Sequence, residues 1–266
     1  MPIAHLNGVN IAYDIIGQGQ PLLLLMGLGG DSSHWSLQVP ALSQQYQVIT
    51  MDNRGAGRSD APADGYSTEM MAQDAALLLA YLNINTVHVL GFSLGGYIAQ
   101  HLALQHPAKV KSLLLSHTAA KSPERTTHLM ATLAKMFSEG VSRELRLRAT
   151  IPWMFSADFL TNEEQLNNLT ALALNPLYPQ SQQGYTGQVD AIRQHNTEQS
   201  LHRLTMPTLL LTSREDLLIP CTLVQAMQPS LPQAKLHILE RGGHCSYIEN
   251  AHQYNQAILH FLRDLA

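Results

Sequence analysis

The chain contains six short, continuous apolar runs, and between most of them the apolar residues recur at helical spacing. The runs occupy residues 21–26, 46–51, 86–91, 110–116, 207–213 and 234–240. Strands that are apolar on both faces are typical of a parallel sheet covered by helices on each side. The pattern therefore predicts an α/β protein with a doubly wound, mostly parallel sheet.

Two further segments carry local signals. Asn7-Gly8 separates two alternating runs near the N-terminus, and this dipeptide favours a β-hairpin because both residues tolerate positive φ. Residues 66–83 place apolar side chains at helical spacing after Ser67 or Thr68, either of which can cap a helix. We expect a hairpin first and a helix between the second and third apolar runs.

The alternation of strands and helices breaks down between residues 121 and 205, where no strand-like run occurs. Helical patterns cover residues 127–137 and 162–174, and prolines interrupt the pattern at Pro152, Pro176 and Pro179. A single α/β core with one insertion fits a chain of 266 residues. We predict a core formed by 1–120 and 206–266, and a helical cap formed by 121–205.

Ser93 lies in the sequence GFSLGG, between an apolar run and a helical pattern. A strand, Gly-x-Ser-x-Gly and a helix in this order form a nucleophile elbow. The serine backbone is strained in such a turn, and the residues two before and two after it must be small. Gly91 and Gly95 meet this requirement, and Gly96 eases the approach of the helix. We predict that Ser93 is a nucleophile at the start of a helix, where the helix dipole favours developing negative charge.

A serine nucleophile needs a histidine base, and the histidine needs a carboxylate that orients it. In hydrolases with this elbow the chain order is Ser, acid, His. His244 follows the last apolar run in a glycine-rich turn, and Glu215 and Asp216 follow the preceding run. We choose Asp216 as the acid and keep Glu215 as the alternative. Most other histidines lie within predicted strands or helices, where a structural role is expected: His88, His101, His106, His202 and His237.

The reaction also needs two backbone N–H donors for the oxyanion of a tetrahedral intermediate. One donor comes from the residue after the nucleophile, which is Leu94. The other comes from a loop after an earlier strand, and the glycine-rich turn that follows residues 21–26 is in the matching place. We choose the N–H of Leu28 as the second donor.

Four motifs in this order resemble those of the α/β-hydrolase superfamily, and the resemblance covers essentially the whole chain. They are DNRGAGRSDAP at 52–62, GFSLGG at 91–96, SREDLLIP at 213–220 and GGHCSYIEN at 242–250. Within the superfamily the chain looks most like 3-oxoadipate enol-lactonases and small bacterial carboxylesterases. The resemblance implies the α/β-hydrolase fold, with a mostly parallel eight-stranded sheet and helices on both faces. The chain departs from many relatives by having Met26-Gly27 in place of His-Gly, and Leu94 in place of Met.

Four side chains are candidates for the wall of a substrate pocket. Met26 belongs to the oxyanion turn, and His117 follows the run 110–116 at the carboxyl edge of the sheet. Trp153 and Phe155 lie in the predicted cap, where they could contact an acyl group. Packing within the core is an equal alternative for His117, Trp153 and Phe155.

These residues together predict a serine hydrolase that cleaves a carboxylic ester or lactone through an acyl-enzyme. Two alternatives use the same triad, namely a perhydrolase of the haloperoxidase type and a carbon–carbon bond hydrolase. A third alternative is a non-catalytic ligand-binding protein with the same fold, because fold does not determine activity. A dinucleotide site is disfavoured because neither MGLGG nor GAGRSD completes Gly-x-Gly-x-x-Gly.

Composition and charge indicate which kinds of partner the protein binds and in which cellular compartment it is expected. The net charge is −4 and the basic residues are scattered, which argues against nucleic acid or an anionic membrane as the main partner. A small-molecule substrate fits better, and we expect neither a cofactor nor a metal because no metal-binding spacing occurs. No secretory signal is visible at the N-terminus, so we expect a cytoplasmic protein. Cys221 and Cys245 are expected to be reduced and buried, with a redox pair as the less favoured alternative.

The motif at 52–62 contains two arginines that could meet a substrate carboxylate. A buried arginine in such a loop more often donates hydrogen bonds to backbone carbonyls and so stabilises the loop. We therefore expect structural roles for Arg54 and Arg58.

Overall fold

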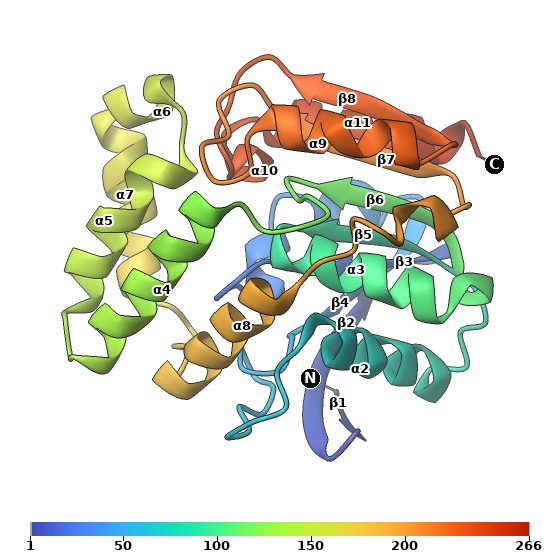
Figure 1. Ribbon diagram of the computed structural model, residues 1–266, viewed down its shortest axis with the longest axis horizontal. Coiled ribbons are helices and arrows are strands. Elements are labelled where there is room, and N and C mark those ends of the chain that lie inside the picture. The colour runs from blue at the N-terminus through green and yellow to red at the C-terminus, as the bar shows by residue number, and fades with distance from the viewer. Residues whose placement is uncertain (1, 266) are drawn as a thin grey trace.

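A computed structural model describes residues 2–265, and it contains one eight-stranded sheet with the order β1-β2-β4-β3-β5-β6-β7-β8 (Figure 1). The strands are β1 Ile3–Leu6, β2 Val9–Ile16, β3 Gln20–Leu25, β4 Tyr46–Met51, β5 Val87–Phe92, β6 Val110–Ser116, β7 Thr208–Ser213 and β8 Ala234–Leu239. Strands β3 to β8 are parallel to one another, and β2 is antiparallel to both β1 and β4. All six apolar runs form strands, so the predicted mostly parallel sheet is confirmed.

The N-terminal hairpin forms as its Asn-Gly signal predicts. Asn7 and Gly8 have φ values of 51° and 75°, and β1 pairs with β2 so that Leu6 faces Val9. Positive φ at both central residues matches the turn that joins right-twisted antiparallel strands.

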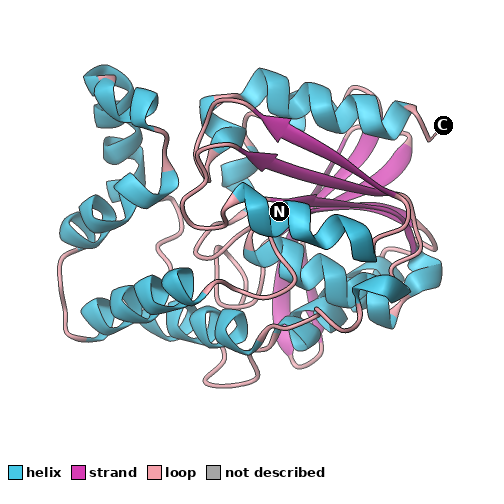
Figure 2. Ribbon diagram, turned by 45° about the horizontal axis from the view of Figure 1, so that its top comes forward, coloured by secondary structure: helices cyan, strands magenta, loops and turns pink. Residues whose placement is uncertain are grey.

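Helices cover both faces of the sheet (Figure 2). Alternate residues of β3 face opposite sides of the sheet. Leu23 and Leu25 pack into one apolar cluster, and Leu22 and Leu24 pack into the other. The first cluster includes side chains of α2 Thr68–Tyr81, α3 Leu94–Gln105 and α9 Cys221–Met227. The second includes side chains of α1 Val39–Leu42, α10 Ser246–Glu249 and α11 Ala251–Arg263. Ser67 caps α2 by accepting a hydrogen bond from the Met70 N–H, as one of the two predicted capping residues.

Between β6 and β7 the described chain is helical. It forms α4 Glu124–Ser138, α5 Arg143–Met154, α6 Ala157–Thr161, α7 Glu163–Leu174 and α8 Gln182–Gln194. Helices α4 to α7 lie to one side of the sheet, and α8 runs back toward it (Figure 1). The insertion leaves and rejoins the core at one place, because Lys121 forms a β-bridge with Asn196 and the Thr197 N–H donates to the Ala120 carbonyl. The two ends of the insertion therefore meet at residues 120–121 and 196–197, and the boundaries at 121 and 205 stay a prediction.

The prediction that Pro152 interrupts a helix is wrong. Pro152 lies inside α5, which continues to Met154. Proline removes the one hydrogen bond that its own N–H would donate to the carbonyl of residue 148. Pro152 lies only two residues before the end of α5, so the helix loses a single hydrogen bond near its C-terminus and is not broken.

In the described range 2–265, none of the helices is long and apolar enough to cross a membrane.

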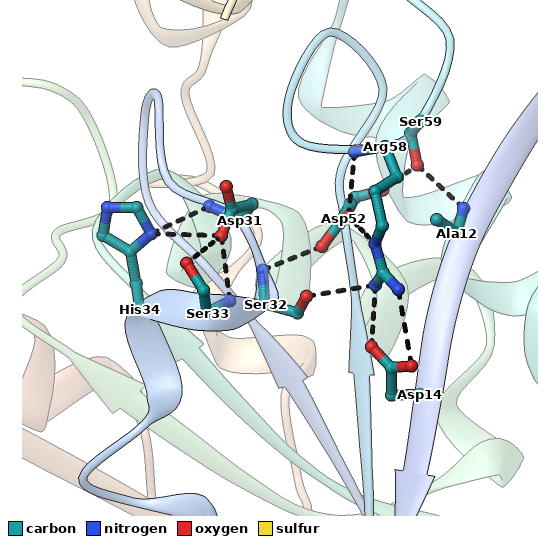
Figure 3. A network of polar contacts seen from close by, with 9 residues as sticks. All are labelled: Ala12, Asp14, Asp31, Ser32, Ser33, His34, Asp52, Arg58 and Ser59. Carbon is teal, nitrogen blue, oxygen red and sulfur yellow. Dashed lines mark hydrogen bonds and ion pairs between the residues drawn. The ribbon is translucent and has the colours of Figure 1, made fainter. Parts of the chain in front are cut away.

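Both arginines of the motif at 52–62 have structural partners. Arg54 is buried and pairs with Asp74, and it also donates to the Gly65 carbonyl. Arg58 donates to the carboxylates of Asp52 and Asp14 (Figure 3). Burial lowers the pKa of Arg58, but the hydrogen bonds and charges of the two carboxylates outweigh burial and keep that pKa above its ordinary value.

The Arg58 network reaches the turn that follows β3. Asp52 accepts hydrogen bonds from the Ser32 N–H at 2.8 Å and from the Arg58 N–H at 3.0 Å (Figure 3). Asp31 accepts a bond from the Ser33 N–H, which begins the short helix Ser32–Trp35. The network therefore holds the chain just after the predicted oxyanion turn.

Replacing Arg58 with Met should destabilise the fold. Asp52 is fully buried, and its charge would lose its cationic partner, so the free energy of unfolding should fall by about 3–5 kcal/mol. Urea denaturation followed by circular dichroism measures the change. The control is Arg148→Met, because Arg148 pairs with Glu144 on an exposed helix surface and should lose less than about 1 kcal/mol. Equal losses in the two variants would contradict the assigned role of Arg58.

Candidate active site

Ser93 occupies the turn between β5 and α3 with φ 54° and ψ −118°. This positive φ is unusual for a residue with a side chain and indicates backbone strain. The serine side chain makes no capping hydrogen bond to α3, so its hydroxyl is not committed to the helix. The structure thus contains the strand, strained serine and helix that the motif predicts.

The glycines around Ser93 are required by close backbone contacts. A Cβ on Gly95 would collide with the Leu25 carbonyl oxygen at the end of β3, and a Cβ on Gly91 would collide with the Gly95 carbonyl. A Cβ on Gly96 would overlap the Thr118 side chain. Side chains at these positions would push α3 away from the sheet and would move Ser93 with it.

His244 and Asp216 form a buried pair at the carboxyl ends of β8 and β7. The His244 Nδ1 lies 2.8 Å from the Asp216 Oδ2, and the two residues are 2% and 3% exposed. The other Asp216 oxygen accepts hydrogen bonds from the N–H groups of Leu218 and Ile219, at 2.9 and 2.8 Å. A carboxylate at Oδ2 favours the tautomer with hydrogen on Nδ1, which leaves Nε2 free to accept a proton.

The alternative acid, Glu215, lies elsewhere. Its carboxylate faces the N–H of Ala157 in the cap at 3.4 Å. The contact that orients His244 is therefore made by Asp216, as the chosen assignment requires.

The turn after β3 approaches Ser93 closely. A Cβ on Gly27 would lie 3.2 Å from the Ser93 Cβ, so the N–H groups that follow Gly27 are near the serine. The turn is held by the Asn53 side chain, which donates to the Met26 carbonyl at 2.9 Å, and by the Gly29 N–H, which donates to Gln188 Oε1 at 3.0 Å. Leu28 lines the adjoining cavity, whereas Leu94 is fully buried at the start of α3 and can contribute only its backbone.

A cavity of about 290 Å³ lies between the core and the cap and contains both Ser93 and His244 in its wall. Its remaining wall is mainly apolar. Met26 and Phe155 line the cavity, as expected for pocket residues. Other residues of the core and the cap in its wall include Leu28, Phe137, Arg143, Arg146, Leu147, Thr150, Ile151, Met154 and Ala173.

The structure does not support His117 and Trp153 as pocket residues, because neither is part of the cavity wall. Trp153 packs against the core cluster of α2 and α3. His117 is fully buried beneath the triad candidates. The packing alternative is therefore correct for both residues.

His117 connects the two loops that carry Asp216 and His244. Its Nε2 lies 2.6 Å from the Ser213 Oγ and 2.9 Å from the Ser246 Oγ, and its ring is 5.8 Å from the His244 ring. Burial lowers the pKa of His117 to about 3, although the Asp216 charge opposes the shift. Its Nδ1 lies 2.9 Å from the Ser116 Oγ. In a neutral imidazole one ring nitrogen donates and the other accepts, so His117 can donate to a hydroxyl through one nitrogen and accept from a hydroxyl through the other.

The sequence did not reveal the contacts between the His244 loop and the cap. The Cys245 N–H donates to the Met154 carbonyl at 2.9 Å, and Glu249 accepts from the Gly243 N–H and from the Ser156 N–H.

Cys221 and Cys245 are both free and buried, as the favoured interpretation of two buried thiols expects. Burial raises the pKa of the Cys245 thiol well above its ordinary value.

Among residues 2–265, no group of three or more His, Cys, Asp or Glu side chains is arranged to hold a metal ion.

The family profile described as the alpha/beta hydrolase fold matches residues 20–251. The chain therefore belongs to this family, as its four motifs and its sheet order indicate.

Relatives include RutD of Stutzerimonas stutzeri (strain A1501), to which carbamate hydrolysis is ascribed. RutD is 31% identical over 260 residues, which cover 95% of this chain and 96% of RutD. BpoC of Mycobacterium tuberculosis, described as a non-haem bromoperoxidase, is 30% identical over 258 residues, which cover 95% of this chain and 97% of BpoC. The crystal structure of the enol-lactonase from Burkholderia xenovorans LB400 matches with a TM-score of 0.91 and 26% identity, over 98% of this chain and 100% of the enol-lactonase.

His117 should make stability depend on pH. Its folded-state pKa lies below the ordinary value of about 6.5, so protonation favours the unfolded chain. The stability that the neutral ring contributes is fully present above pH 6.5 and is lost as the pH falls from 6.5 toward 3. Between pH 7 and 5 the wild type should lose about 2 kcal/mol more free energy of unfolding than His117→Asn. Urea denaturation at both pH values measures this difference, and an identical loss in both proteins would contradict a neutral buried His117.

Proposed function

We propose that the protein is a serine hydrolase that cleaves a carboxylic ester or lactone of a small substrate through an acyl-enzyme. The observation that carries the proposal is the buried His244–Asp216 pair, which shares one cavity with a serine held at positive φ. A serine hydroxyl is a weak nucleophile unless a base removes its proton. His244, which Asp216 orients and which lines the same cavity as Ser93, supplies this base in the proposal.

In the proposed reaction the Ser93 Oγ attacks the substrate carbonyl carbon while its proton passes to the His244 Nε2. Asp216 keeps the ring in the required tautomer and stabilises its positive charge. The N–H groups of Leu28 and Leu94 hold the oxyanion of the tetrahedral intermediate. The protonated His244 then gives its proton to the leaving alcohol, and a water molecule activated by the same imidazole releases the acid from Ser93.

The similar proteins support chemistry at a carbonyl carbon in general, and their names suggest several particular reactions. Lactone and carbamate hydrolysis, which the names of two similar proteins suggest, both break a bond at a carbonyl carbon. The similarity to BpoC supports a second candidate, in which hydrogen peroxide replaces water in attacking the acyl-enzyme and releases a peracid. No step of either reaction calls for a cofactor.

The proposed cap completes the site. Residues from α4, α5 and α7 form much of the cavity wall, whereas Ser93, Asp216 and His244 belong to the core. We assign the chemistry to the core and substrate selection to residues 121–205.

Substitutions test the triad directly with 4-nitrophenyl acetate as substrate. Ser93→Ala and His244→Gln should each lower kcat by at least about 10⁴-fold, and Asp216→Asn should lower it by about 10³- to 10⁴-fold because the imidazole then takes the wrong tautomer. Stopped-flow or steady-state absorbance measures nitrophenolate release, and circular dichroism confirms that each variant is folded.

The matched control for Asp216→Asn is Glu215→Gln, at the neighbouring, half-buried carboxylate. This variant should keep kcat within about threefold of wild type, because Glu215 makes no contact with His244 in the described structure. Full activity in Ser93→Ala, or equal losses at positions 215 and 216, would rule out the proposed triad.

A further inference from the structure

The cavity wall is positively charged although the protein as a whole is negative. The net charge of the chain is −4, yet the residues that line the cavity include Arg143 and Arg146 and no aspartate or glutamate. Charged side chains in a pocket of otherwise apolar residues are usually there to orient a ligand. Arg143 is exposed and Arg146 is half-buried, so the positive charge lies where both solvent and a ligand in the cavity can reach it.

Within residues 2–265, neither Arg143 nor Arg146 forms an ion pair with a carboxylate, whereas Arg54, Arg58, Arg148, Arg193, Arg214 and Arg241 each do. The Nε of Arg143 donates to the Ala173 carbonyl at 2.7 Å, and the Nε of Arg146 donates to the Val141 carbonyl at 3.2 Å. The Arg146 guanidinium also stacks on the Phe137 ring, 3.6 Å from its centroid. Each guanidinium is thus held through its Nε, and its terminal nitrogens remain available to a ligand.

The two arginines belong to one stripe of α5. Arg143, Arg146, Leu147, Thr150, Ile151 and Met154 line the cavity, and this spacing places them on one side of a helix. The stripe ends at Met154, whose carbonyl accepts the N–H next to His244. At 1.5 Å per residue, Arg146 and Arg143 lie about 12 and 16 Å from Met154 along the helix axis. Apolar side chains separate the arginines from the predicted reaction centre.

We propose that Arg143 and Arg146 form a subsite for an oxyanion, a carboxylate or a phosphate, at the end of the substrate distant from the scissile carbonyl. The inference rests on the proposed ester or lactone hydrolysis and specifies its substrate class. The substrate is an ester or lactone in which an apolar spacer joins the reacting carbonyl to an anionic group.

The chemistry of the guanidinium group supports this assignment. Arginine presents a planar fork of donors that matches the two oxygens of a carboxylate or phosphate. Burial lowers the pKa of both arginines, and the Arg143 charge lowers the pKa of Arg146 further. An anion between two like charges relieves their repulsion, whereas a neutral substrate leaves the repulsion in place.

Matched esters test the subsite on both sides of the scissile bond. One series compares 4-nitrophenyl hemiesters of dicarboxylic acids, and of ω-phosphoryl acids, with 4-nitrophenyl alkanoates of the same chain length. The other compares acetate esters of ω-hydroxy acids with acetates of the corresponding alkanols. The measured quantity is the ratio of kcat/KM for the charged ester to that for its neutral partner. We expect this ratio to exceed about ten in at least one series and to fall as salt is added.

The variants are Arg143→Met and Arg146→Met, and the matched control is Arg148→Met on the same helix. Arg148 does not line the cavity and pairs with Glu144. Each cavity variant should lower the ratio about tenfold, and the control should leave the ratio unchanged. Neutral esters that are hydrolysed with no charge preference in either series would overturn the subsite while the proposed hydrolase function stands.

A binding measurement tests the anion subsite independently of the proposed hydrolase function. Suberate is titrated calorimetrically into Ser93→Ala and into Ser93→Ala combined with Arg143→Met and Arg146→Met. Suberate binding that is weakened at least about tenfold by the arginine substitutions supports the subsite even if no tested ester is hydrolysed. Equal binding to both proteins, or no binding to either, counts against it. Failure of folded wild type to hydrolyse any ester counts against the proposed function alone.

Discussion

The close approach of α3 to the end of β3 is the constraint on which the site depends. The Gly95 backbone lies against the Leu25 carbonyl with no room for a Cβ, so the chain must turn from β5 into α3 within one residue. That residue is Ser93, and its positive φ is the consequence. The same approach brings the helix N-terminus beside the turn that contains Gly27. This backbone contact therefore brings the proposed nucleophile close to the predicted oxyanion turn, which the Asn53 and Gln188 side chains hold in place.

The proposed base and acid, His244 and Asp216, are positioned differently, through hydrogen bonds in a buried layer. The Asp216 carboxylate accepts hydrogen bonds from two N–H groups of its own loop in addition to its contact with His244. Below it, the neutral His117 joins Ser213 and Ser246, one on each loop. A neutral ring at this position links the loops without adding a second charge beside His244. Cap residues complete the layer, because Met154 and Ser156 are hydrogen-bonded to the loop around His244.

The strands, the hairpin and the strained serine could be predicted because each depends on a few neighbouring residues. Continuous apolar runs, Asn7-Gly8 and Gly-x-Ser-x-Gly are all local signals. The inward position of His117 could not be predicted, because its partners lie 96 and 129 residues away in the chain. For Trp153 the sequence leaves a pocket role and packing as equal alternatives. The continuation of α5 through Pro152 decides between them, because Trp153 is out of phase with the cavity-lining residues of that helix.

The central claim is that Ser93 is an activated nucleophile, and intact-mass spectrometry after exposure to a small fluorophosphonate tests it most directly. The reagent bonds to a serine oxygen only when a neighbouring base activates it. The account predicts one adduct on the wild-type chain, mapped to Ser93, and none on folded Ser93→Ala. A wild-type chain that stays unmodified, or an adduct that persists in Ser93→Ala, would contradict the account.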